Sequence, residues 1–326
     1  MQKLTRWLFA TALPLLALLF LFSRTLAKDI PVEQLLPLDA TGASKFVDVK
    51  GLSVHYRDEG TGPPLLLLHG TGASLHTWNA WASALSSHHR VIRMDLPGFG
   101  LTGPSRAGDY SIPAFVAFVE AFREALGLSR FALGGNSLGG EIAWSYAVAY
   151  PQRVTELVLV DPAGFPIEKP ALVFTLARIP VLSTLLTKLD PGPMVKRTLR
   201  EAYGDPSKVT PALVARYRRL ALREGNRVAF VARAQQARVD RSAAISLVRV
   251  PTLVLWGSED HLIPVADAAR FSHAIPGAEL IIYDGVGHVP MEEIGDRSAR
   301  DVDAFLVKHR TDEQANGAPS SAPQGR

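Results

Sequence analysis

Short apolar runs alternate with stretches of helical spacing along most of this chain, and that alternation constrains the fold more than any other feature. Runs such as PLLLL, RVIRM and VTELVLV have the length and composition of strands that are buried on both faces. Segments such as SIPAFVAFVEAFREALGL have the spacing of an amphipathic helix. The pattern predicts an α/β fold with a mostly parallel sheet that helices cover on both faces.

The alternation occupies two parts of the chain and is interrupted once. Residues 45–164 and 246–310 carry it and form the predicted core, whereas residues 29–44 lack sustained periodicity and are interpreted as a linker. Residues 165–245 show helical patterns separated by Pro and Gly, without a buried-strand run, which predicts an all-helical cap inserted into the core. Residues 311–326 are polar and rich in Pro, Gly and Ser, so we expect them to be disordered.

Composition excludes several classes of function. The chain has 326 residues and no cysteine, so disulfides, thiolate zinc sites and cysteine nucleophiles are absent. The formal net charge of +4 is supplied entirely by residues 1–28, which contain four basic residues and no acidic one. The remaining chain is balanced, and we therefore expect no nucleic-acid partner.

The predicted cap is the basic part of the molecule. Residues 165–245 contain 15 Lys or Arg and 6 Asp or Glu. Such a block can be a set of solvated helix faces or a surface that contacts an anionic membrane, and both interpretations stay open. One segment, ALVFTLARIPVLSTLLTKL, favours the membrane because its leucines and Ile179 recur at helical spacing. The positions of this apolar stripe are Leu172, Leu176, Ile179, Leu182 and Leu186.

The amino terminus contains a candidate membrane segment. Residues 7–23, WLFATALPLLALLFLFS, are uncharged and just long enough to span a bilayer. We expect residues 1–28 to act as an uncleaved anchor, with the catalytic domain exported to the periplasmic side of a bacterial inner membrane. A signal peptide that ends at Ala27, which would release a secreted protein, is the alternative.

A serine among glycines is the first candidate for chemistry. Ser137 lies in GGNSLGG, directly after the apolar run FAL and directly before a helical pattern. GNSLG fits G-x-S-x-G in the context of a strand followed by a helix, which predicts a nucleophile elbow. The alternative is a glycine-rich turn that only lets the helix pack closely on the sheet.

A serine hydroxyl needs a base, and the base needs an orienting carboxylate. His288 follows one predicted strand, in YDGVGHVPMEE, and Asp260 follows the preceding strand, in LWGSEDHLIP. The carboxyl ends of parallel strands meet at one edge of a sheet, so Ser137, Asp260 and His288 should meet there. Asp161, after LVLV, is the rival for the acid.

The remaining requirement is a pair of N–H donors for the oxyanion of the transition state. We predict the amide of Leu138, directly after the serine, and the amide of Thr71 in the loop HGTGAS. No phosphate-loop or dinucleotide motif is present, nor a His pair with metal-ligand spacing on a helix, so we predict neither cofactor nor metal.

Together, HGTG, DLPGFGLTG, GNSLGG, WGSEDHLIP and GVGHVPMEE resemble the α/β-hydrolase family over residues 46–309. The resemblance implies an eight-stranded sheet, a helical cap between strands six and seven, and hydrolysis through an acyl-enzyme on Ser137. The apolar amino terminus together with DLPGFGLTGP is similar to membrane-associated bacterial lipases and esterases. Asn136 and DPAG are similar to the hydrolases that cleave carbon–carbon bonds in aromatic degradation, although Val289 stands where those enzymes usually carry Trp.

The functional hypothesis is therefore a serine hydrolase that cleaves a small-molecule or lipid ester. The alternatives are cleavage of a carbon–carbon, lactone or amide bond, or cofactor-free peroxide chemistry, on the same residues. A binding protein without activity is a further alternative, which the full set of candidate catalytic residues disfavours.

Overall fold

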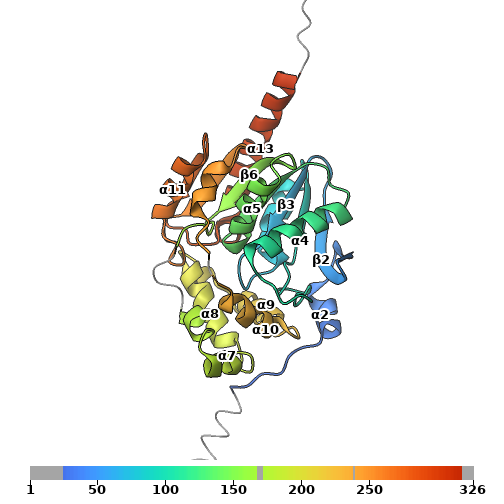
Figure 1. The fold of residues 1–326 in the computed structure, drawn as a ribbon, viewed down its shortest axis with the longest axis vertical. Coiled ribbons are helices and arrows are strands. Elements are labelled where there is room, and N and C mark those ends of the chain that lie inside the picture. The colour runs from blue at the N-terminus through green and yellow to red at the C-terminus, as the bar shows by residue number, and fades with distance from the viewer. Residues whose placement is uncertain (1–24, 167–171, 238, 318–326) are drawn as a thin grey trace, which may run out of the picture.

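The core of the protein is one eight-stranded sheet in the order β1-β2-β4-β3-β5-β6-β7-β8 (Figure 1). The computed structural model describes residues 25–166, 172–237 and 239–317. β1 and β2 form an antiparallel hairpin, β2 is antiparallel to β4, and the other neighbouring strands are parallel. The strands are Ser44–Val49, Leu52–Glu59, Pro64–Leu68, Arg90–Met94, Phe131–Asn136, Val154–Val160, Thr252–Gly257 and Glu279–Tyr283. The predicted α/β fold, with its mostly parallel eight-stranded sheet, is confirmed.

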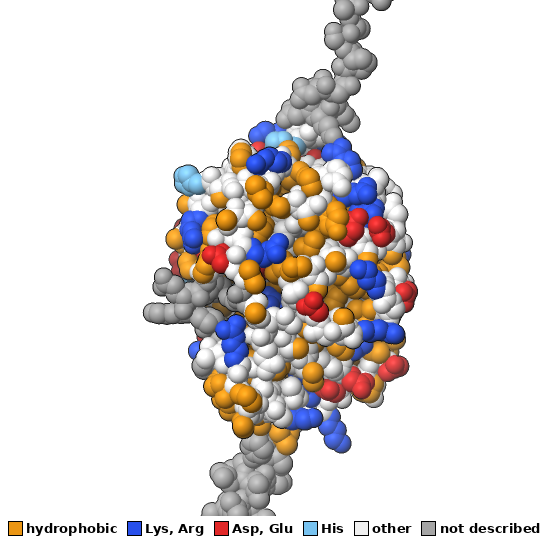
Figure 2. Space-filling model, in the orientation of Figure 1, with side chains coloured by type: hydrophobic (Ala, Val, Ile, Leu, Met, Phe, Trp, Pro, Cys, Tyr) orange, Lys and Arg blue, Asp and Glu red, His pale blue; other side chains and the backbone are white. Residues whose placement is uncertain are grey.

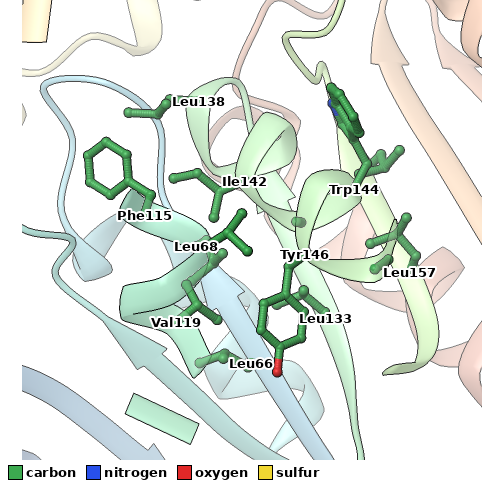
Figure 3. Packing of buried hydrophobic residues seen from close by; sticks show 14 of the residues in the cluster. Leu66, Leu68, Phe115, Val119, Leu133, Leu138, Ile142, Trp144, Tyr146 and Leu157 are labelled. Carbon is green, nitrogen blue, oxygen red and sulfur yellow. The ribbon is translucent and has the colours of Figure 1, made fainter. Parts of the chain in front are cut away.

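Helices cover both faces of this sheet and create two separate cores. One core gathers residues of α4 (Ile112–Ala125), α5 (Leu138–Ala149) and α11 (Ala266–Ala274). The other gathers residues of α3 (Asn79–Leu85) and α13 (Gly295–Gly317). Strand β3 is apolar throughout because both of its faces are buried. Leu66 and Leu68 belong to the first core (Figure 3), and Leu65 and Leu67 belong to the second.

The cap is inserted between β6 and β7, as predicted. Its helices are α6 (Leu172–Leu176), α7 (Pro180–Leu186), α8 (Gly192–Ala202), α9 (Pro211–Ala221) and α10 (Asn226–Gln235). The expected apolar stripe from Leu172 to Leu186 does not lie on one helix, because α6 and α7 are separate. Pro180 explains the break, since proline begins a helix readily but disfavours helical geometry in the residue before it.

Residues 29–44, interpreted above as a linker, are instead structured and pack against both the cap and the core. Residues 25–39, here called the N-terminal strap, include helix α2 (Val32–Asp39). The Ala27 N–H donates to the Lys188 carbonyl, and the Ile30 N–H donates to the Leu222 carbonyl. Helix α2 was missed because it is short, contains Pro37 and buries few residues. Its partner in the cap, Arg219, lies 180 positions after Asp39, so the contact leaves no local pattern in the sequence.

The charge of the cap is partly neutralised within the fold. Arg218 forms a bidentate pair with Asp190, and Arg219 forms one with Asp39 of the strap. Arg227 pairs with Asp29, also in the strap. Arg219 and Arg227 therefore fix the cap to the strap, and Arg218 is paired within the cap, so these three arginines do not form a free basic surface.

Two further expectations concern the chain termini. Helix α13 continues to Gly317, so residues 311–317 of the predicted disordered tail are helical. The rest of that tail and the predicted membrane segment, residues 7–23, lie outside the described residues. Among the described residues, no helix combines the length and the apolarity that crossing a bilayer requires.

Asp95 organises the loops behind the candidate site. Its carboxylate is fully buried and accepts hydrogen bonds from the amides of Leu75 and Leu101 and from His55 Nδ1, at 2.7, 2.8 and 2.7 Å. Burial alone would raise the pKa of Asp95, but the charge and the hydrogen bond of His55 hold that pKa well below its usual range. Asp95, the first residue of the DLPGFGLTG segment, thus connects this segment to Leu75 and to strand β2 at His55.

We expect Asp95→Ala to lower the free energy of unfolding by about 3 kcal/mol or more, because two buried amides lose their acceptor. Urea unfolding would measure this, with Asp109→Ala as the control, since Asp109 accepts one bond at an exposed turn. A depressed pKa stabilises the fold above the unfolded-state pKa of about 3.9. The advantage of the parent over the variant should therefore shrink as pH falls below that value, and an unchanged midpoint would contradict the role.

Candidate active site

Ser137 occupies a strained turn between β5 and α5. Its φ is 55° and its ψ is −116°, a conformation that side-chain-bearing residues rarely adopt. The glycines on either side are required by space. A Cβ on Gly135 would lie 2.2 Å from the Gly139 carbonyl oxygen, and a Cβ on Gly139 would lie 2.1 Å from the Leu68 carbonyl oxygen. The sequence thus holds a serine at the carboxyl edge of the sheet, on a turn that has no room for a side chain at Gly135 or Gly139.

His288 and Asp260 meet at the same edge of the sheet. His288 Nδ1 lies 2.7 Å from Asp260 Oδ2, and both side chains are buried. The other carboxylate oxygen of Asp260 accepts the amides of Leu262 and Ile263, at 2.8 and 3.0 Å. An ionised Asp260 therefore fixes the imidazole with a proton on Nδ1, which leaves Nε2 as the basic nitrogen.

The backbone of His288 is held from two sides. Its N–H donates to the Ala202 carbonyl of the cap at 2.7 Å. Its carbonyl accepts a hydrogen bond of 3.0 Å from the side-chain amide of Asn136, the residue directly before Ser137. The same amide also donates to the Val160 carbonyl at 3.1 Å. Asn136 thus links the serine turn, the end of β6 and the histidine loop.

The predicted oxyanion donors lie on two segments that approach each other at the serine. Leu138 is the first residue of α5, where a helix leaves its amides without intrahelical acceptors. Thr71 lies in the loop after β3, directly after Gly70. A Cβ built on Gly70 would come within 3.1 Å of the Ser137 Cβ, so this loop passes close to the serine.

His69 holds this loop in place. Its Nδ1–H donates to the Gly70 carbonyl at 2.8 Å, and its Nε2 accepts the Leu96 amide at 3.0 Å. Burial lowers the pKa of His69, which keeps the ring neutral and Nε2 available as an acceptor. The ring therefore joins the glycine loop to the loop that Asp95 begins.

Asp161, the rival for the acid, follows β6 and points into the same cluster. Its side chain is fully buried, and Oδ1 accepts the Gly257 amide at 2.9 Å. It is Asp260, however, that makes the hydrogen bond with His288. Ligand atoms of Asp161, Asp260 and His288 lie within 4.8 Å of one another, a spacing that a metal ion could also use.

Sequence reasoning missed the hydrogen bonds that Glu292 and Glu293 accept beside the loop of His288. Glu292 accepts hydrogen bonds from the hydroxyls of Thr77, Tyr203 and Tyr217, so it connects the core to helices α8 and α9 of the cap. Neighbouring Glu293 accepts the amide of Gly287 at 2.9 Å. The signal was present in VPMEE, but the partners of these glutamates are distant in sequence.

Comparison with known proteins places this architecture in a family. The family model for the α/β hydrolase fold matches residues 63–293. Lipase 3 of a Moraxella species is 32% identical over 256 residues, which cover 76% of this chain and 78% of that protein. A 2-hydroxy-6-oxo-2,4-heptadienoate hydrolase of Pseudomonas putida is 29% identical over 273 residues, covering 81% and 96% of the two chains.

A solved structure extends the similarity to nearly the whole chain. The crystal structure of a membrane phospholipase A, described as a bacterial virulence factor, superposes with a TM-score of 0.71 at 26% identity. It covers 95% of this chain and 99% of its own. With the sheet order, the inserted cap and the matched family model in agreement, this chain belongs to the α/β-hydrolase fold family.

Proposed function

We propose that this hydrolase cleaves carboxylic esters through an acyl-enzyme on Ser137. The observation that carries the proposal is the strained serine turn beside a buried Asp260–His288 hydrogen bond, at one edge of the sheet. That combination supplies a partly exposed serine hydroxyl as nucleophile and an oriented base. The similarity to Lipase 3 favours esters among the bonds that this arrangement could cleave.

In the proposed reaction, His288 Nε2 accepts the hydroxyl proton of Ser137 while Oγ attacks the ester carbonyl carbon. The amides of Leu138 and Thr71 donate to the resulting oxyanion. When the tetrahedral intermediate collapses, His288 returns its proton to the departing alcohol, and the acyl group stays on Oγ. Water, deprotonated by His288, then releases the carboxylic acid and restores the serine.

Purified protein and p-nitrophenyl esters of graded acyl length test this function directly. We expect turnover with a burst of p-nitrophenol that matches the concentration of active sites, because acylation releases the phenol before water releases the acid. Absence of turnover on every ester would reject the proposal. The same panel reports acyl-length preference.

A second candidate is cleavage of a carbon–carbon bond. The similarity to the P. putida heptadienoate hydrolase favours it, because that alignment covers 96% of the relative. A 2-hydroxy-6-oxo-dienoate substrate separates the two candidates. Faster turnover of this compound than of any ester would make the carbon–carbon hydrolase the main function.

The proposal also places the enzyme on a membrane, through residues 7–23. Two observations support this location. The similar membrane phospholipase A covers 95% of this chain. The described chain also begins beside α7, where the Asp190 N–H donates to the Thr25 carbonyl (Figure 1). A membrane fraction that keeps the protein through an alkaline wash is expected, and a soluble protein beginning near Lys28 would contradict the anchor.

The surface around α7 and the first residues of the strap is suited to contact with an anionic bilayer. Ile179 and Val181 are 45% and 78% exposed, and Leu26 of the strap is 43% exposed. A groove of about 820 Å³ runs beside α7, and its lining includes Lys28 and Lys188. We call these five residues the α7 patch; hydrophobic side chains gather at this end of the molecule (Figure 2). Apolar groups flanked by lysines are typical of interfacial contacts.

We expect Ile179→Ser/Val181→Ser to reduce hydrolysis of long-chain esters in phosphatidylglycerol vesicles by about fivefold or more, since each lost side chain weakens interfacial burial. Hydrolysis of p-nitrophenyl acetate should be unchanged. Leu247→Ser/Ile282→Ser is the matched control, because these residues are 53% and 48% exposed on the core. Equal loss in both double variants, or equal loss on both substrates, would contradict a membrane-contacting patch.

A further inference from the structure

A second buried carboxyl group lies against the carboxylate of the candidate triad. Asp161 follows β6 and Asp260 follows β7, which are parallel neighbours in the sheet. Asp161 is fully buried and Asp260 is 8% exposed. One carboxyl oxygen of each aspartate and one ring nitrogen of His288 lie within 4.8 Å of one another. Two carboxylates so close in a buried site cannot both be ionised without a large electrostatic cost, so one proton is shared unequally between them.

The hydrogen bonds decide which residue keeps the charge. Asp260 accepts three of them, from two backbone amides and from His288. Asp161 accepts one, from the Gly257 amide on Oδ1, whereas its buried Oδ2 has no hydrogen-bond partner among the described residues. Donors stabilise the ionised form of a carboxyl group, so the negative charge belongs on Asp260 and the proton on Asp161.

We propose that Asp161 is a neutral carboxylic acid whose Oδ2–H donates to the carboxylate of Asp260, and that it positions this carboxylate for His288. The proton gives the buried Oδ2 of Asp161, which accepts no hydrogen bond from the described residues, a hydrogen bond to donate. The added donor fixes the orientation of the Asp260 carboxylate, and with it the orientation of the His288 ring that is hydrogen-bonded to that carboxylate. Asp161 is thus a positioning residue, not a substitute acid.

The surroundings of Asp161 agree with this assignment. Burial is the main cause that raises its pKa well above the usual range, and the charge of Asp260 raises it further. Glu293 adds a smaller effect in the same direction. Tyr283 is a further titratable group that interacts with Asp161, and His288 belongs to the cluster itself. Among the described residues, no basic side chain is one of the main groups that act on Asp161, so the charges around it do not favour its ionised form.

Asp161→Asn and Asp161→Leu separate a neutral donor from an ionised carboxylate. Asparagine can keep both interactions, because its oxygen accepts from Gly257 and its NH₂ donates to Asp260. We expect Asp161→Asn to retain kcat/KM on a p-nitrophenyl ester within about threefold, with the acid limb of its pH profile unmoved. Asp161→Leu, which offers no donor, should lose about tenfold or more.

Two outcomes would overturn the assignment. If Asp161 were ionised, Asp161→Asn would remove a negative charge next to His288, and the acid limb would shift down by about one pH unit or more. If Asp161 only filled space, the Asn and Leu variants would lose activity equally. These kinetic measurements rest on the proposed ester hydrolysis, and absence of turnover in the parent would test that function rather than Asp161.

A second measurement does not depend on activity. A carboxyl whose folded-state pKa is raised stabilises the fold at pH below its unfolded value of about 3.9, and this stabilisation is lost as pH rises towards the folded pKa. Asp161→Asn should therefore become increasingly more stable than the parent from about pH 4 to pH 7 in urea unfolding. Asp267→Asn is the control, since Asp267 is also buried but pairs with Arg270 at 2.8 Å. A stability advantage of Asp161→Asn that does not grow with pH would overturn the proposal.

The third measurement addresses a metal ion at the same cluster. We expect EDTA to leave the turnover and the melting temperature of the parent unchanged, and Zn²⁺ to stabilise the parent no more than Asp161→Asn. Loss of turnover with EDTA, or stabilisation by Zn²⁺ that requires Asp161, would replace the neutral acid with a metal ligand.

Discussion

Ser137→Ala is expected to reduce ester turnover by about 10⁴-fold or more while leaving the protein folded, because the members of a triad act as a unit. Alanine keeps the Cβ of serine, so the strained backbone at φ 55° is neither relieved nor worsened. The midpoint of thermal unfolding should therefore stay close to that of the parent. Steady-state rates and the p-nitrophenol burst would be measured on the same preparations.

Ser145→Ala provides the matched control. Ser145 lies on α5, the helix that follows Ser137; it is 2% exposed, and its hydroxyl has no hydrogen-bond partner among the described residues. Its loss should leave the rate unchanged. A Ser137→Ala protein with a rate near that of the parent would show that the turn is a packing device and that the nucleophile lies elsewhere.

Asp260→Asn is expected to lower kcat by about 10³- to 10⁴-fold without loss of structure. The amides of Leu262 and Ile263 can still donate to the side-chain oxygen of asparagine. The asparagine NH₂ then faces His288 Nδ1, which forces that nitrogen to accept and places the proton on Nε2, where a base is needed. Single-turnover kinetics would show slow acylation.

The paired variant is Asp161→Asn, because this aspartate was the alternative acid. We expect it to remain active, since the hydrogen bond to His288 comes from Asp260. The reverse result, with Asp161→Asn inactive and Asp260→Asn normal, would assign the role of the acid to Asp161, after β6, instead of Asp260, after β7.

Much of this architecture could be predicted from local sequence. Strands such as PLLLL are buried on both faces, and this produces a continuous apolar run that periodicity detects. The candidate residues could be located because each follows a strand whose carboxyl end lies at the same edge of the sheet. The order of the strands did not follow from these patterns, since it depends on pairing between distant segments.

The failures share a physical cause, which is that distant partners decided the outcome. The strap that contains helix α2 is held by residues at the ends of α9 and α10, so composition alone favoured a linker. The sequence shows Arg218 and Arg219 as unpaired positive charges, because their partners, Asp190 and Asp39, are brought beside them only by the fold. The proximity of Asp161 to Asp260 likewise depends on the neighbouring positions of β6 and β7.

The strap has a consequence for how substrate reaches Ser137. Asp39 is 1% exposed; its carboxylate holds Arg219 of the cap, and its carbonyl accepts His76 Nε2 of the core. Helix α2 therefore connects the cap to the core. If α9 moved away from the core alone, the buried carboxylate of Asp39 would lose Arg219, and if α2 moved with α9, its contact with Leu101 would be lost. Cap and strap should therefore open together as one cooperative unit. Substrate entry would then depend on a rare, concerted opening rather than on fraying of a single helix. Because Asp39 is buried and the Arg219 side chain is only 27% exposed, salt should alter the rate of opening little.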